Sequence, residues 1–161
     1  MSASKHLAHI LVIPEDGRNR QLANGFCLGL TTRQVQVLPE AGGWTKVLEL
    51  FKSVHICEMN QCPQRYMVLL IDFDGRQDRL DTAKSYIPTH LSERVIVLGV
   101  WTEPEKLKSP GQTYEFIGQW LARECRDGQN EIWSHDLLCH NAGEIERLHA
   151  QIRPILFPPT D

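Results

Sequence analysis

Four short apolar runs, separated by segments of helix length, constrain the fold of this chain more than any other feature. Each run is rich in Val, Ile or Leu and is bounded by turn residues, which is typical of β-strands. The runs cover residues 9–13, 33–38, 66–73 and 94–101. Because strands that alternate with helices usually lie parallel and connect by right-handed crossovers, we expect a mostly parallel sheet.

The segments around these runs carry apolar residues at helical spacing. They predict helices over residues 17–30, 44–59, 79–86, 113–125 and 134–152. The first helix contains Gly25 and Gly29, each of which costs about 1 kcal/mol relative to alanine in a helix interior. The sequence therefore predicts a compact, Rossmann-like α/β fold: a four-stranded sheet flanked by helices, with a helical C-terminal addition.

The patterns of the runs also assign their places in the sheet. Residues 33–38 alternate between apolar and polar, which predicts a half-buried edge strand. Residues 66–73 and 94–101 are apolar almost throughout, which is typical of strands covered by helices on both faces.

Composition limits the class of protein. The chain has 161 residues, of which 42% are hydrophobic, so it suits one domain, residues 1–161, with a substantial core. A net charge of −3 gives no overall basic field for nucleic acid. No apolar stretch of about 18 residues exists to span a membrane. The first apolar run enters a Pro-Glu-Asp-Gly turn rather than a signal-peptide cleavage site, so we expect a cytoplasmic protein.

The five cysteines predict reduced thiols. Their number is odd and their spacing irregular, which favours free thiols over a disulfide framework. His55, Cys57 and Cys62 form the nearest approach to a zinc-binding set, but they lack the paired Cys-x2-Cys spacing of structural zinc sites.

Acidic residues follow three of the four predicted strands. They are Glu15 and Asp16, then Asp72 and Asp74, then Glu103 and Glu105. Ligands of open parallel sheets bind beyond the carboxyl ends of the strands. Clustered carboxylates repel one another, and Mg²⁺ or Mn²⁺ bound by oxygen ligands relieves that repulsion. The alternative is that each acid begins a loop or caps the next helix.

Two further patterns surround these acids. Asp72 and Asp74 are two residues apart, so on an extended strand their side chains share one face. Basic residues follow each acidic pair closely, and Arg18, Arg76 and Lys106 are the candidates for binding phosphate. An acidic chain can in this way carry a local basic rim around a metal centre.

The segments VIPEDG and IDFDG together resemble the Toprim domain, which occurs in topoisomerases, primases, small ribonucleases and the OLD-type nucleases of phage defence. The family pattern is a glutamate after the first strand and an Asp-x-Asp motif after the third. Here Glu15 matches the glutamate, and Asp72 and Asp74 match the motif. Glu103 or Glu105 matches a further acid that OLD-like members often carry. The resemblance covers residues 8–108 and leaves 109–157 as the helical addition.

The chain departs from the family pattern at two positions. Asp16 stands between Glu15 and Gly17, where the family glutamate is usually followed directly by glycine, so either acid can be the equivalent residue. Nuclease-type members often have another acid four residues after the glutamate, and Asn19 occupies that place here.

The segment LLIDFDG is also similar to the first motif of haloacid-dehalogenase-type phosphatases, in which the first aspartate is a nucleophile. That family places the motif on its first strand and follows the glycine with threonine. Here the motif follows the third predicted strand, and Arg76 replaces the threonine.

The resemblance to Toprim proteins implies a Mg²⁺- or Mn²⁺-dependent nuclease acting on DNA or RNA. It implies that Asp72 and Asp74 hold the metal, and that Glu15 acts as general acid/base or as a second ligand. Glu103 or Glu105 would complete a second metal site. The alternative is a non-catalytic Toprim-like module that binds a protein partner in a defence or toxin–antitoxin system. Asn19 and the net negative charge favour this alternative.

Overall fold

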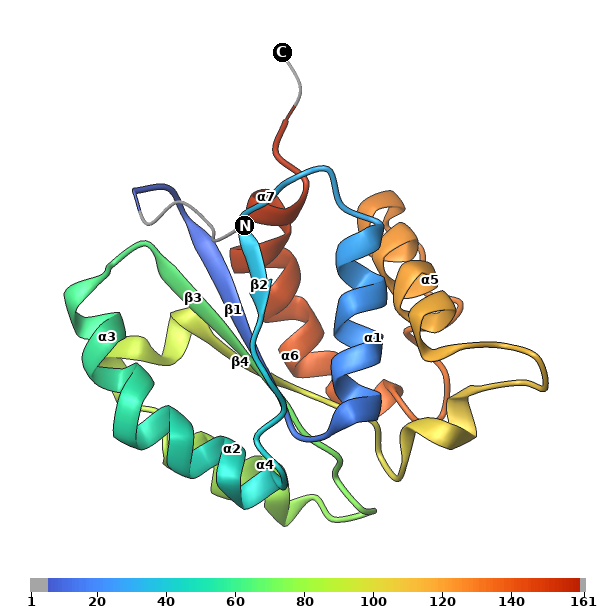
Figure 1. Ribbon diagram of the computed structural model, residues 1–161, viewed down its shortest axis with the longest axis horizontal. Helices are drawn as coiled ribbons and strands as arrows, with labels where there is room; N and C mark the ends of the chain where they lie inside the picture. The colour runs from blue at the N-terminus through green and yellow to red at the C-terminus, as the bar shows by residue number, and fades with distance from the viewer. Residues whose placement is uncertain (1–5, 160–161) are drawn as a thin grey trace.

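The computed structural model describes residues 6–159 and shows a four-stranded parallel sheet between two layers of helices (Figure 1). The strand order is β2-β1-β3-β4. The strands are β1 (His9–Pro14), β2 (Val35–Val37), β3 (Arg65–Leu70) and β4 (Val95–Leu98). All three pairings are parallel, so the predicted α/β class is confirmed.

The position of each strand follows its sequence pattern. β1 is buried along its whole length and pairs with β2 on one side and β3 on the other. Val12 lies opposite Val37 of β2 and Val68 of β3, which places apolar side chains in rows across the sheet. β2, where polar Gln36 alternates with valines, is an edge strand as expected.

Two groups of helices cover the two faces of the sheet (Figure 1). One face packs against α2 (Trp44–Leu50), the π-helical turn η1 (Phe51–His55), α3 (Ile56–Gln61) and α4 (Asp78–Ser85). The other packs against α1 (Gly17–Leu28), α5 (Tyr114–Asp127), α6 (Ala142–Arg147), the π-helical turn η5 (Leu148–Ile152) and α7 (Arg153–Leu156). Short 3₁₀ turns are η2 (Thr89–Arg94), η3 (Pro104–Leu107) and η4 (Cys139–Asn141).

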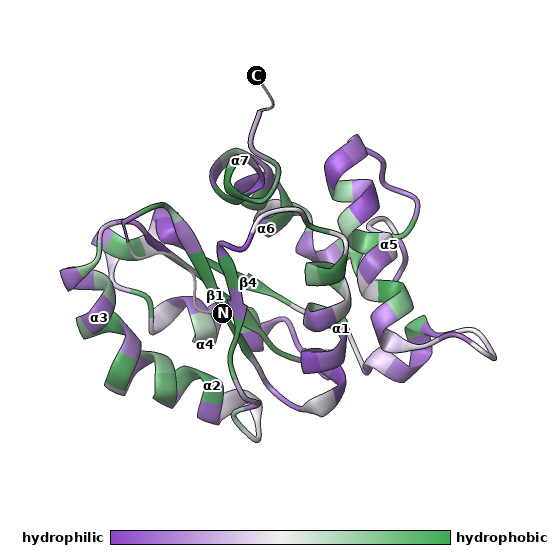
Figure 2. Cartoon of the chain, turned by 45° about the horizontal axis from the view of Figure 1, so that its top comes forward, coloured by the Kyte–Doolittle hydropathy of each residue, from purple (hydrophilic) through white to green (hydrophobic). Residues whose placement is uncertain are grey.

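Side chains alternate between these two layers. Leu11 and Ile13 belong to the core under α2 and α3, whereas Ile10 and Val12 belong to the core under α1 and α5. The strands are hydrophobic along much of their length, and the helices alternate between hydrophobic and hydrophilic residues (Figure 2). The buried apolar residues of the helices pack against those of the sheet. The sheet is therefore buried on both faces, as its apolar strands require.

Gly25 of α1 and Gly118 of α5 lie where the two helices meet. A Cβ atom added to Gly25 would lie 2.2 Å from the carbonyl oxygen of Glu115, and one added to Gly118 would lie 2.2 Å from that of Leu22. The two backbones approach too closely for any side chain at either position. This contact compensates for the helix propensity that Gly25 loses.

The predicted helix over 134–152 is wrong at its start. Residues 131–138 form turns, and regular helix begins only after η4. The buried carboxylate of Glu124 in α5 fixes the beginning of these turns, because it accepts hydrogen bonds from the backbone N–H groups of Glu131 and Ile132 at 3.1 and 2.7 Å. These hydrogen bonds form because the chain folds back onto α5, which the local pattern of apolar residues does not predict.

The other predicted helices lie close to their expected bounds. The stretch predicted over 44–59 is helical through Gln61, with the π-helical turn η1 inside it. Among residues 6–159, none of the helices combines the length and the apolar character needed to span a bilayer.

Candidate active site

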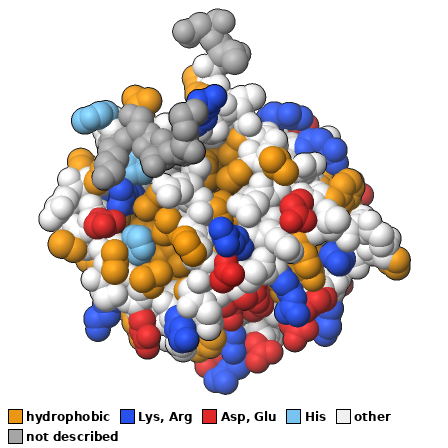
Figure 3. Space-filling model, viewed as in Figure 1, with side chains coloured by type: hydrophobic (Ala, Val, Ile, Leu, Met, Phe, Trp, Pro, Cys, Tyr) orange, Lys and Arg blue, Asp and Glu red, His pale blue; other side chains and the backbone are white. Residues whose placement is uncertain are grey.

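The carboxyl ends of β1, β3 and β4 meet at one edge of the sheet, and acidic residues of all three connections lie there. The backbone N–H of Glu15 donates to the carbonyl of Leu70 at 2.9 Å, so β1 and β3 remain paired up to the first acid. Below the strand ends of Figure 1, acidic and basic side chains gather along the lower edge of the surface (Figure 3).

Glu15 and Asp72 are in direct contact. The Oε2 atom of Glu15 accepts a 2.5 Å hydrogen bond from the backbone N–H of Asp72. This bond fixes the Glu15 carboxylate against the segment that carries Asp72. The prediction that acids from the first and third strands meet is therefore realised for this pair.

Asn19 joins Asp72 to the second acid of the first connection. Its Nδ2 atom donates to Oδ1 of Asp72 and to Oδ1 of Asp16, both at 3.0 Å. The same Asp16 oxygen caps α1 by accepting from the backbone N–H of Asn19 at 2.9 Å. Both acids are thus linked to Asp72. Glu15 accepts a hydrogen bond from the Asp72 backbone N–H, and Asp16 is joined to the Asp72 carboxylate by Asn19.

The Asp72 carboxyl is unusually hard to ionise. Burial raises its pKa to about 7, and the neighbouring charges of Glu15, Asp16 and Glu105 contribute to the rise, against a lowering by the hydrogen bond from Asn19. The pKa of Glu15 is also raised, mainly by burial, although the N–H of Asp72 opposes the shift. Both acids are half-buried, and each holds its proton more tightly than a free carboxyl does.

Asp74 points away from this pair. It takes a left-handed backbone conformation, with φ of 51°, which aspartate tolerates better than most residues. Its side chain is 69% exposed and lies 3.5 Å from Nη2 of Arg79. The expected common face of Asp72 and Asp74 does not form, because the extended backbone turns at Asp74.

Arg79 is the basic residue that lies within the site. Its side chain is only 15% exposed, and its guanidinium lies over the ring of Trp44, 4.7 Å from the ring centroid. Nη1 donates to the carbonyl of Asp72 at 2.8 Å. The charge of Arg79 opposes the pKa rise of Glu15, so this arginine partly neutralises the acids.

The two acids that follow β4, Glu105 and Glu103, differ in their relation to Asp72. Glu105 in η3 lies close enough to raise the pKa of Asp72, and its Oε1 pairs with Nη1 of Arg18 at 2.7 Å. Glu103 is exposed and contributes no such influence on Asp72. Glu105 is therefore the better placed of the two candidates.

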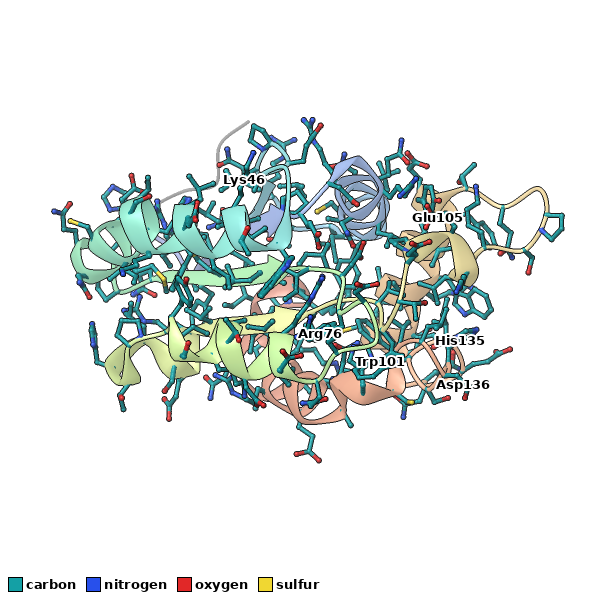
Figure 4. All side chains as sticks on the ribbon, turned by 90° about the horizontal axis from the view of Figure 1, so that it is seen from below. Lys46, Arg76, Trp101, Glu105, His135 and Asp136 are labelled. Carbon is teal, nitrogen blue, oxygen red and sulfur yellow. The ribbon has the colours of Figure 1, made fainter. Side chains whose placement is uncertain are left out.

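The three predicted phosphate-binding residues differ in their surroundings. Arg18 is paired with Glu105, and Arg76 is paired with Asp78 at 2.7 Å on the surface. Lys106 is exposed. Figure 4 looks onto this edge of the molecule and shows Lys46, Arg76 and Glu105 reaching it from three different elements.

The donor atoms at Asp72 suit a hard divalent cation. They are the carboxylates of Glu15 and Asp72. Asn19 turns its Nδ2 to Asp72, while its buried Oδ1 has no hydrogen-bond partner within residues 6–159. Mg²⁺ commonly binds through one or two carboxylates, with water and substrate phosphate completing its shell. In the same described part of the chain, no group of three or more His, Cys, Asp or Glu side chains is arranged to hold a metal. Neither the zinc candidates His55, Cys57 and Cys62 nor three or more of the predicted acids are therefore gathered into such a group.

The sequence patterns missed Asn19, Arg79 and Trp44 as members of the site. Asn19 stands out in the sequence only as a departure from the family pattern, and Arg79 only as one of several basic residues after the Asp-x-Asp segment. Trp44 begins a helix on a different connection. The contacts of all three depend on how distant segments pack, which a local pattern does not encode.

A comparison with known proteins found no match: no family model, no curated protein and no solved structure matches the chain. The fold and the geometry of the site are therefore the grounds on which a function can be assigned.

Proposed function

We propose that this protein is a Toprim-like, divalent-cation-dependent phosphodiester-processing enzyme, a nuclease acting on DNA or RNA. One observation carries the proposal: the half-buried Asp72 carboxylate lies among Glu15, Asp16 and Glu105, and its pKa is raised to about 7. Strongly shifted pKa values at the carboxyl edge of a parallel sheet favour a functional site over a structural one.

Glu15 and Asp72 would hold the cation, since their carboxylates lie together at the ends of the two central strands. Bound Mg²⁺ or Mn²⁺ would polarise a phosphate oxygen and lower the pKa of a coordinated water. Arg79 keeps the Asp72 segment in place through the Asp72 carbonyl. Exposed Arg76 and Lys106 provide cationic groups for phosphates on either side of the reacting one. Asp74 on the exposed turn, and Glu105 paired with Arg18, are further acids available to a metal or a proton.

A non-catalytic interaction module is the second candidate, and Asn19 favours it. The two N–H bonds from Asn19 to Asp16 and Asp72 offset carboxylate charge without a metal. In that case the acids would be structural, and the chain would act by binding a protein partner.

Metal binding separates the two candidates. We expect Mg²⁺ or Mn²⁺ to raise the Tm of the wild type by about 5–10 °C at one hundred times Kd, since ligand stabilisation there is about 2.7 kcal/mol. Asp72→Asn should abolish the rise. Asp81→Asn, which changes an exposed carboxylate of α4, is the matched control and should keep it. Equal melting curves with and without metal for all three proteins would exclude the metal site.

Cleavage assays test catalysis itself. Plasmid DNA and a structured RNA are incubated with Mg²⁺ or Mn²⁺ and the wild type, Asp72→Asn or Asp81→Asn. We expect metal-dependent cleavage by the wild type and the Asp81 variant, and a loss of at least about 100-fold for Asp72→Asn. Metal binding without cleavage of either substrate would contradict the nuclease activity and leave only the metal site.

A further inference from the structure

A cavity of about 120 Å³ lies in the core between the sheet and the helices on its α1 face. The sheet, α1 and η5 all contribute to its wall, through residues that include Ile10, Val12, Val68, Ala23, Leu148 and Ile152. Protein interiors are close-packed and contain few voids larger than a water molecule. A void of this size costs stability through the contacts that its wall loses, so its presence points to an occupant.

The two faces of the sheet differ in how fully they are packed. Val12 and Val68 lie opposite each other on the two central strands and line the cavity, and each is 8% exposed. Ile13 and Leu69, the next pair along the same strands, belong to the core on the other face and are 0% exposed. The free space is therefore a property of the α1 face and not of the sheet as a whole.

The arrangement of the helices accounts for this space. α1 packs closely on α5 but only loosely on η5 and α7, although all of them cover the same face of the sheet (Figure 1). Phe26 and Cys27 of α1 and Val35 of the edge strand β2 also line the cavity, and these three residues are half-buried. The cavity therefore comes nearest to the surface beside the edge strand.

Within residues 6–159, the wall of the cavity offers a ligand no strong polar group that is unpaired. The side chain of Asn141 is paired with the backbone of Gly99, through Nδ2 at 2.9 Å and Oδ1 at 3.3 Å. The indole N–H of Trp133 donates to the carbonyl of Leu121 at 3.0 Å. Burial raises the pKa of the Cys27 thiol to about 11, so this thiol is neutral at pH 7. A charged or strongly polar ligand would lose its hydration here without replacement.

We propose that this cavity is a binding site for a small, uncharged, apolar molecule of about the size of a benzene ring. An apolar cavity of about 150 Å³ engineered in another protein stays dry and binds benzene or xenon, so the size and the lining here suit the same class of ligand. The inference does not depend on the proposed metal site, and either can fail without the other.

The first test follows the methyl groups of the wild type by ¹H–¹³C NMR as benzene is added. We expect saturable shifts at Val12 and Val68, because the bound ring lies against their methyl groups, and no shift at Ile13 or Leu69. Phenol has the same ring but a hydroxyl group that finds no partner, so it should bind at least about tenfold more weakly. Unchanged methyl signals at Val12 and Val68, or equal binding of phenol, would overturn the proposal.

The second test fills the cavity and measures Tm with and without benzene. Benzene at ten times Kd should raise the Tm of the wild type by about 3–6 °C. Ala23→Leu extends a larger side chain from α1 into the cavity and should abolish this rise. Asn24→Leu places the same side chain on the exposed side of the same helix and should keep it.

A rise in Tm that persists in Ala23→Leu would place benzene elsewhere and refute the cavity as its site. Should Ala23→Leu not fold, the methyl shifts of the wild type decide alone. Benzene binding without any effect of Mg²⁺ or Mn²⁺ on Tm would support this inference and exclude the metal site. The reverse result would exclude the apolar site and leave the proposed function in place.

Discussion

Asp72 is the residue whose chemistry the fold changes most. In isolation its carboxyl would be ionised at neutral pH, but burial and the charges of Glu15, Asp16 and Glu105 raise its pKa from 3.8 to about 7. The folded protein therefore keeps a proton on Asp72 between roughly pH 4 and pH 7, where the unfolded chain has lost it. Stability linked to this group is present below pH 4 and is lost as the pH rises through 7.

We expect this linkage to appear in the difference between two melting profiles. Asp72→Asn cannot ionise, so the Tm of the wild type should fall relative to that of the variant between pH 4 and pH 7 and then stay parallel. Taking the difference between the two proteins removes the contribution of buried histidines such as His55. The pKa of His55 is lowered, so its contribution to stability rises with pH instead of falling. Profiles that stay parallel over the whole range would mean that Asp72 ionises normally. Adding Mg²⁺ at pH 8 should restore wild-type stability but not change the variant.

At the scale of elements, glycines allow α1 and α5 to pack closely against each other. Gly25 and Gly118 lie where the two backbones meet, so neither position has room for a Cβ atom. α1 also carries Asp16 at its N-cap and Asn19 in its first turn. The glycine contact therefore helps to place the helix that completes the candidate site.

Gly118→Ala should destabilise the protein although alanine is the better helix former. The gain in propensity is about 1 kcal/mol, but the new Cβ would lie 2.2 Å from the carbonyl oxygen of Leu22 and force the helices apart. We expect a net loss of about 2 kcal/mol, measured by urea unfolding. Gly143→Ala in α6 meets open space and should be neutral or slightly stabilising. Equal effects of the two changes would contradict this packing.

At the scale of the whole molecule, the C-terminal third belongs to the same core as the sheet. Leu148, Ile152 and Leu156 are buried in one cluster with Ile10 and Ile96 of the sheet. The helical addition beyond residue 108 thus covers one face of the sheet. Without it, α1 alone would cover that face, and apolar side chains such as Ile96 would be exposed to water.

We predict that a fragment ending at residue 108 does not fold cooperatively, as judged by circular dichroism during thermal melting. In the full chain, Ile152→Ala should cost about 2–5 kcal/mol, the usual range for a large-to-small change in a core. Leu28→Ala, at a position that is 67% exposed, should change stability by less than about 0.5 kcal/mol. A stable, cooperatively melting fragment would show that the C-terminal helices are dispensable.

Much of this architecture could be predicted from the sequence. The apolar runs, their alternation with helices and the edge position of β2 all follow from local patterns of burial, and the structure contains each of them. The start of the last helical region could not be predicted, because Glu124 holds the preceding turns from another element.

The sequence by itself determined that acids follow three of the parallel strands, because the order of strands and acids is local in the chain. Which of these acids lie beside Asp72 was decided by the tertiary structure. Only the tertiary structure decided how they are used. Asn19 contacts Asp72 across 53 residues of chain, and Arg79 lies over Trp44 of a different connection. The backbone turn at Asp74 carries its side chain away from Asp72. These contacts arise from the packing of distant segments, whereas the order of strands and acids is local in the chain.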